Sequence, residues 1–145
     1  MTRRARKRLD QLPRRERQIM DILFELGEGT AEDVRSRLPD PPSYSAARAL
    51  LTRLERKEMV EHSERDLRYV YRPLVSLREA RTSATERLVR TFYDGSLAAA
   101  ASGLLERSVD RLDDEELDRL AGLIERARRA RQADDERRGG GGGER

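Results

Sequence analysis

The apolar residues of this chain change their spacing near residue 59, and that change limits the folds open to it. Before it, they recur three or four positions apart in short runs, as on one face of a helix. Residues 59–63 and 68–72 then hold strand-favouring side chains on either side of a polar turn at 64–67. Pro73 ends this segment, and the helical spacing returns. The sequence therefore predicts a mainly α fold with one small β-hairpin.

Glycines, prolines and capping residues bound the helical runs before the hairpin. We expect a first helix over about 12–26, with Pro13 in its first turn, and a second over about 30–38. Thr30 and Asp33 have the spacing of a capping box at the start of the second. A third helix follows from Ser43 or Ser45 to about residue 57. Three short helices followed by a hairpin are the plan of a winged helix-turn-helix.

The outer face of the third helix is polar, which suits a recognition helix in the major groove of DNA. Arg48 can reach a guanine edge, serine and threonine can bond phosphate or base, and alanine offers a surface to the thymine methyl group. Arginines at the hairpin tip, or wing, would contact phosphates. For any one of these residues, a solvated surface position is an equally good interpretation. The predicted DNA-binding residues are Ser43, Ser45, Ala46, Arg48, Ala49, Thr52, Arg53, Arg65 and Arg68.

The charge distribution also favours a polyanionic partner. The 31 Lys+Arg and 28 Asp+Glu give a net charge of +3, but residues 1–75 carry +4 and residues 76–145 carry −1. Five of the six residues at positions 3–8 are basic, within a predicted flexible arm over 1–11 that would add affinity or enter the minor groove. An Arg-rich solvated surface, from a GC-biased genome, is the alternative explanation.

The second half is predicted to be helical, with stripes too small to form an independent core. Packing against a second copy across a two-fold axis would bury them, and a dimer would place two recognition helices on a palindromic DNA site. The alternative is a monomer whose second half folds back onto the first. The predicted dimerisation residues are Leu88, Phe92, Leu97, Leu104, Leu105, Leu117, Leu120 and Ile124.

Composition argues against an enzyme or a membrane protein. The chain has no cysteine and one histidine, His62, so we expect no metal, no cofactor and no catalytic residues. The acidic run at 113–116 fits a helix start, where carboxylates meet the positive end of the dipole. No run approaches the roughly 18 apolar residues of a spanning helix, and no secretory signal follows the basic N-terminus. We expect a cytoplasmic, nucleoid-associated protein without membrane insertion.

Five segments together resemble the BlaI/MecI/CopY family, the penicillinase-repressor type of bacterial transcription regulator. The resemblance covers about residues 12–128, and the order and spacing of the five segments carry it. They are LPRRERQIMDIL at 12–23, TRLERK at 52–57, YVYRPL at 69–74, FYDGSL at 92–97 and LDDEEL at 112–117.

The resemblance implies a homodimeric repressor that binds dyad operators near promoters of resistance or stress genes. It implies a winged-helix domain followed by a helical dimerisation domain, which we place at residues 12–74 and 75–130, with a disordered Gly/Arg-rich tail at 131–145. In the penicillinase branch, a membrane sensor-protease pathway leads to cleavage of the repressor in its dimerisation domain.

The sequence departs from this family pattern in four places. The absence of cysteine excludes the copper branch's C-terminal cysteine cluster. Gly103-Leu104 stands where the penicillinase branch has its Asn-Phe cleavage site, and Glu58 stands where the turn before the wing usually has glycine. Ser45-Ala46 aligns with a Lys-Thr pair, so the family's operator sequence does not carry over.

Two other classes of function stay open on the sequence. One is an architectural protein that binds DNA non-specifically through the basic arm and the wing. The other is an adaptor whose winged helix binds a partner protein, which the fold alone does not exclude. If random DNA competes as well as a promoter fragment, the architectural protein is favoured over a specific repressor. If the chain fails to bind genomic DNA at low salt, the adaptor is favoured.

Overall fold

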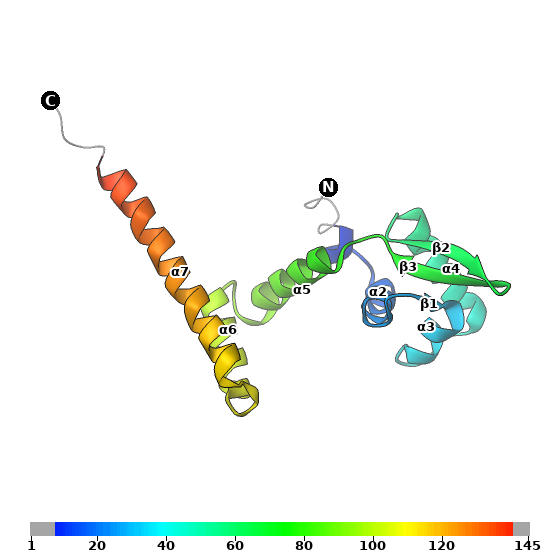
Figure 1. Cartoon of the computed structure of the whole chain (residues 1–145). Helices are drawn as coiled ribbons and strands as arrows, with labels where there is room; N and C mark the ends of the chain where they lie inside the picture. Colours follow the sequence, from blue (N-terminus) through cyan, green and yellow to red (C-terminus); the bar gives the residue numbers. More distant parts are fainter. Residues whose placement is uncertain (1–7, 141–145) are drawn as a thin grey trace. The chain divides into compact units, whose positions relative to one another are not determined.

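A computed structural model describes residues 8–140 and divides the chain into two compact units, one ending at Ser96 and one beginning at Leu97 (Figure 1). The first unit combines short helices with a three-stranded antiparallel sheet, and the second is helical. The elements of the first unit include α2 (Arg14–Leu26), β1 (Gly29–Thr30), α3 (Ala31–Arg37), α4 (Tyr44–Arg56), β2 (Val60–Arg65), β3 (Arg68–Pro73) and α5 (Leu77–Phe92). This order confirms the predicted mainly α, winged-helix fold.

Local signals set the ends of these helices. Thr30 and Asp33 form the predicted capping box, in which each side chain bonds the backbone N–H of the other. Ser43 caps α4 by accepting a hydrogen bond from the Ala46 N–H. Gly27 closes α2 with a φ of 80°, which glycine adopts without strain. Pro13 is the N-cap residue of α2, one position before the first helical residue, so it does not occupy the first turn as predicted.

The sheet has the strand order β1-β3-β2, with β3 in the centre. β1 was not predicted, because two residues are too few to show an alternating pattern. Arg65 pairs with Arg68 in the β2–β3 register, so only Asp66 and Leu67 form the turn. The paired part of the wing is therefore longer than predicted, because the hydrogen-bonded ladder includes two residues that the sequence analysis placed in the turn.

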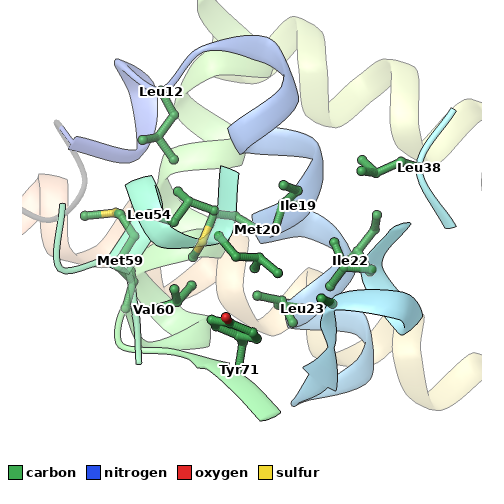
Figure 2. Packing of buried hydrophobic residues seen from close by; sticks show 14 of the residues in the cluster. Leu12, Ile19, Met20, Ile22, Leu23, Leu38, Leu54, Met59, Val60 and Tyr71 are labelled. Atoms are coloured by element: carbon green, nitrogen blue, oxygen red, sulfur yellow. The ribbon is translucent and has the colours of Figure 1, made fainter. Parts of the chain in front are cut away.

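The hydrophobic core lies where α2, α4 and the sheet meet (Figure 2). Ile19 and Leu23 of α2 are fully buried and share this core with Leu54 of α4, Val60 of β2 and Tyr71 of β3. Each such side chain contributes about 1.5–3 kcal/mol when it leaves water. Because this core holds the apolar face of α4, the opposite, polar face of the helix points outward.

The predicted flexible arm over residues 1–11 is wrong for its last part. Residues 8–10 are helical, and Leu9 is buried in the core cluster with Leu12. The reason is that these two leucines find apolar partners that sequence spacing does not reveal. Residues 1–7 lie outside the described part of the chain.

α5 packs with the first unit rather than beginning the second. Val75 is buried in the core, Ala80 packs against it, and the Ser83 hydroxyl donates a hydrogen bond of 2.8 Å to Asp10 Oδ1. The compact unit therefore extends to Ser96, past the domain boundary predicted after residue 74. Sequence alone gave no sign of this, because α5 has the same amphipathic pattern as the helices after it.

The second unit contains α6 (Leu97–Ser108), a 3₁₀ turn (Val109–Arg111) and the long helix α7 (Asp114–Gly139). Asp113 and Glu116 form a capping box at the start of α7, in agreement with the interpretation of the acidic run as a helix start. The prediction of a disordered tail from residue 131 does not hold for 131–139, which continue α7. Six of these nine residues are Arg, Ala, Gln or Glu, which favour helix. Residues 141–145 lie outside the described part of the chain.

Candidate nucleic-acid interface

The outer face of α4 is exposed as the sequence predicted. Ser45, Arg48, Ala49 and Thr52 are all exposed, whereas Ala47, Leu51 and Leu54 are buried beneath them. Of the other predicted DNA-binding residues of this segment, Ser43, Ala46 and Arg53 are also exposed. Their accessibility fits contact with DNA, and their assignment as contact residues stays a prediction.

The turn between α3 and α4 is held by an arginine from α2. Nη1 of Arg15 donates to the Pro39 carbonyl at 2.5 Å, and Nη2 donates to the Asp40 carbonyl at 2.8 Å. Asp40 has a φ of 47°, a left-handed conformation that short polar residues tolerate. The planar fork of one guanidinium therefore fixes the corner from which α4 projects.

All three hydroxyls of the predicted site already have local partners, and those of Ser43 and Ser45 share a hydrogen bond of 3.3 Å. The Ser43 hydroxyl accepts the Ala46 N–H at 3.2 Å, and the Thr52 hydroxyl donates to the Arg48 carbonyl at 2.9 Å. Each hydroxyl has remaining hydrogen-bonding capacity for an incoming phosphate or base. Ser43 thus has a structural role at the N-terminus of α4 besides its predicted role in binding.

Aromatic rings of the wing support Arg48. Its guanidinium carbon lies 5.8 Å from the centroid of the Tyr69 ring, within range of a cation–π interaction. Tyr69 in turn stacks on His62, with centroids 4.3 Å apart, and Nδ1 of His62 contacts Oε1 of Glu55 at 2.5 Å. These contacts restrict the directions that the Arg48 side chain takes before it binds.

The two wing tyrosines, Tyr69 and Tyr71, differ in burial. Tyr71 is 3% exposed, and burial raises the pKa of its phenol. Tyr69 is 42% exposed and faces Arg48. Both rings lie against His62, and only Tyr71 reaches the core.

A hollow of about 520 Å³ lies between α4, the wing and residues 30–32 at the start of α3, and Glu32 and Glu64 are among its lining residues. Arg48 and Tyr44 line it from α4, while Leu67, Arg68 and Tyr69 line it from the wing. The exposed helix face and the wing tip thus share one concave surface. Tyr44, which is absent from the predicted DNA-binding residues, is also exposed on this surface.

The wing arginines Arg65 and Arg68 are not equivalent. The Arg65 guanidinium forms a forked pair with Glu28, with distances of 2.6 Å and 3.0 Å, and this pair lowers the pKa of the Glu28 carboxyl. Within residues 8–140, Arg68 forms no ion pair. Arg68 is therefore the readier of the two to contact a phosphate.

Residues 8–140 contain no group of three or more His, Asp or Glu side chains placed to hold a metal ion. In the same range, no helix is long and apolar enough to span a membrane.

The three helices, the wing and the exposed outer face of α4 define a protein of the winged helix-turn-helix class. Residues 12–126 match the family model of the penicillinase repressor. The chain belongs to that family, whose members are transcriptional repressors, and the expected BlaI/MecI/CopY resemblance is confirmed.

Three of the solved structures similar to this chain are a repressor, a protein whose DNA binding is regulated and a putative transcriptional regulator. A CopR repressor structure is 30% identical to this chain, and the match covers 40% of this chain and 87% of the CopR chain, with a TM-score of 0.37. Bordetella bronchiseptica BpsR, whose DNA binding is regulated by 6-hydroxynicotinic acid, is 11% identical, with 86% of each chain covered and a TM-score of 0.42. A Pseudomonas aeruginosa putative transcriptional regulator is 20% identical, with 90% and 84% covered and a TM-score of 0.43. No match to a curated protein was found.

Proposed function

We propose that this chain is a homodimeric, sequence-specific repressor that occupies a dyad operator at a promoter. Family membership establishes a DNA-binding repressor, and the exposed outer face of α4 carries the proposal of sequence specificity. Arg48 is the residue on that face with the reach and donor geometry to contact a guanine. Its contact with Tyr69 favours one orientation of the side chain.

Substitution of Arg48 tests sequence specificity. The operator is first recovered by footprinting the purified protein on fragmented genomic DNA. Arg48→Ala should then reduce discrimination between operator and random DNA by about 1–3 kcal/mol. The matched control is Arg68→Ala, which should weaken binding to both DNAs equally. An unchanged specificity ratio for Arg48→Ala in a gel-shift competition would contradict the choice of contact residue.

Exposed apolar side chains of the second unit support the dimer. Ala100 is the one buried residue at positions 97–140, and a helical pair with so little core needs a further partner. A hollow of about 530 Å³ beside α7 is lined partly by leucines, including Leu120 and Leu123. A second copy would cover such a face through a two-fold interface. The predicted dimerisation residues that are exposed are Phe92, Leu97, Leu104, Leu117 and Ile124, whereas Leu88, Leu105 and Leu120 are partly buried.

Sedimentation equilibrium tests the dimer directly. Wild-type protein should sediment at twice the chain mass of 16.7 kDa. Leu104→Glu and Ile124→Glu should shift it toward one chain, because each places a charge in the proposed apolar interface. Arg131→Glu, on the polar part of α7, is the control and should leave the mass unchanged. A wild-type protein that sediments as a single chain would overturn the dimer.

The regulated genes and the signal complete the proposal. By analogy with the family, we propose control of resistance or stress genes in the bacterial cytoplasm, at the nucleoid. A sensor-protease pathway acting on this chain would have to cut a dipeptide other than Asn-Phe, because Gly103-Leu104 occupies that position in α6. Footprinting identifies the genes, and immunoblotting after β-lactam exposure tests for cleavage.

An architectural, non-specific DNA-binding protein is the competing candidate. The six positions 3–8 are its main support, because five of them are basic and would bind any phosphate backbone. Deletion of residues 1–7 should abolish binding under this alternative and leave operator selectivity intact under the main proposal. Random DNA that competes as well as operator DNA would favour the alternative.

A further inference from the structure

We propose that Leu67, at the tip of the wing, is an apolar wedge that enters the minor groove of bound DNA and partly unstacks a base step. This inference rests on the proposed DNA complex and adds a contact that the predicted site lacks. Leucine is one of the side chains that minor-groove proteins insert between base steps.

The backbone at the tip is unfavourable for leucine. Asp66 and Leu67 form a two-residue turn with φ values of 50° and 63°, both left-handed. Such turns strongly prefer Asn-Gly or Asp-Gly, because a side chain with Cβ crowds the backbone in this conformation. Asp66 meets the preference and Leu67 does not. Glycine at position 67 would make a more stable hairpin.

The Leu67 side chain gains nothing from the core of its own subunit. It is 94% exposed, the highest value among the exposed large hydrophobic residues of the described chain. A leucine that is both strained and fully in water contributes nothing to folding that glycine would lack. Its side chain gains apolar contacts only if it is buried on binding.

The surroundings of Leu67 indicate DNA as the partner. Leu67 and Arg68 line the same hollow as Arg48 of α4, so the wing tip and the recognition helix meet a ligand from one side. Arg68 is exposed beside it, placed to neutralise a phosphate while the leucine contacts the groove floor. A duplex with α4 in its major groove therefore presents its neighbouring minor groove to the wing tip.

The test compares three variants of the full chain on the footprinted operator. Leu67→Gly and Leu67→Asn suit the left-handed turn and should raise or preserve the melting temperature, yet bind about tenfold more weakly, the loss expected from one buried leucine. Leu67→Met keeps an apolar side chain and should retain most of the affinity. A merely structural role would move stability and affinity in the same direction.

A second measurement reports the base step itself. 2-Aminopurine placed at successive positions flanking the recognition site should brighten when wild-type protein or Leu67→Met binds, because unstacking relieves its quenching. Leu67→Gly should not produce this signal. Affinity and fluorescence equal to wild type in Leu67→Gly would overturn the wedge, as would an affinity loss without any wild-type fluorescence change. Failure of the wild-type protein to bind operator at all would instead overturn the proposed function.

Discussion

Nζ of Lys57 lies 2.7 Å from Oε2 of Glu16, which joins the C-terminal end of α4 to the first turn of α2. Glu16 is 1% exposed, and within the described residues its other oxygen, Oε1, has no hydrogen-bond partner. The Lys57 side chain is 44% exposed. The buried carboxylate therefore depends on this lysine, whereas the lysine retains access to water.

This asymmetry predicts unequal effects of two substitutions. Lys57→Met should reduce the free energy of unfolding by about 2–4 kcal/mol, because it leaves a buried charge without a partner. Glu16→Gln should cost less, because Lys57 can turn to solvent. The double variant should recover most of the loss. Urea denaturation of the four proteins checks this, and equal losses in both single variants would contradict the asymmetry.

The turn before the wing predicts a stabilising substitution. Glu58 has a φ of 59°, so it is left-handed at the position where the family resemblance implies glycine. Glu58→Gly should exceed Glu58→Ala in free energy of unfolding by about 1 kcal/mol. Both variants lose the exposed 3.4 Å ion pair with Arg8, so their difference isolates the backbone strain. Equal stability of the two variants in denaturant titrations would argue against strain here.

The pair between Glu28 and Arg65 predicts a gain in DNA affinity. Glu28→Gln should release the Arg65 guanidinium, strengthen binding to random DNA, and steepen the plot of log K against log salt concentration by up to about 0.9, the effect of one added phosphate contact. Combining it with Arg65→Ala should remove the gain. Salt titrations by fluorescence anisotropy measure both. No change in Glu28→Gln would show that Arg65 does not approach the DNA.

The capping box of α3 predicts a pH-dependent contribution to stability. Hydrogen bonds from the Thr30 backbone and side chain lower the pKa of Asp33 below its ordinary 3.8. A depressed carboxyl pKa contributes stability that is complete above the unfolded value and lost as pH falls through the folded value. Asp33→Ala should therefore cost about 0.5–1 kcal/mol near neutral pH and progressively less below about pH 4.

The control for this prediction is Asp33→Asn. Asparagine keeps an oxygen that accepts the hydrogen bonds but does not titrate. The difference in free energy of unfolding between Asp33→Asn and Asp33→Ala should stay constant over the acid range. A wild-type advantage over Asp33→Ala that persists unchanged to pH 2 would show that the charge of Asp33 has no part in the cap.

Most of the fold and the exposed face of α4 could be predicted from the sequence. Their signals are local: the capping box at Thr30, the break at Gly27 and the helical spacing that divides α4 into a buried and a polar face. Such features depend on residues a few positions apart, whose preferences act before any tertiary contact forms. For the same reason, the family resemblance lies in short segments at fixed spacing.

The sequence by itself therefore determined a winged helix with a polar recognition helix, followed by helices with small apolar stripes. Only the tertiary structure decided which arginine of the wing is paired, which tyrosine is buried, and that α5 belongs to the first unit. Arg65 and Glu28 are 37 positions apart, so nothing local brings them together. Packing of the core sets such distances, because burial favours one arrangement of the elements over the many that local preferences allow.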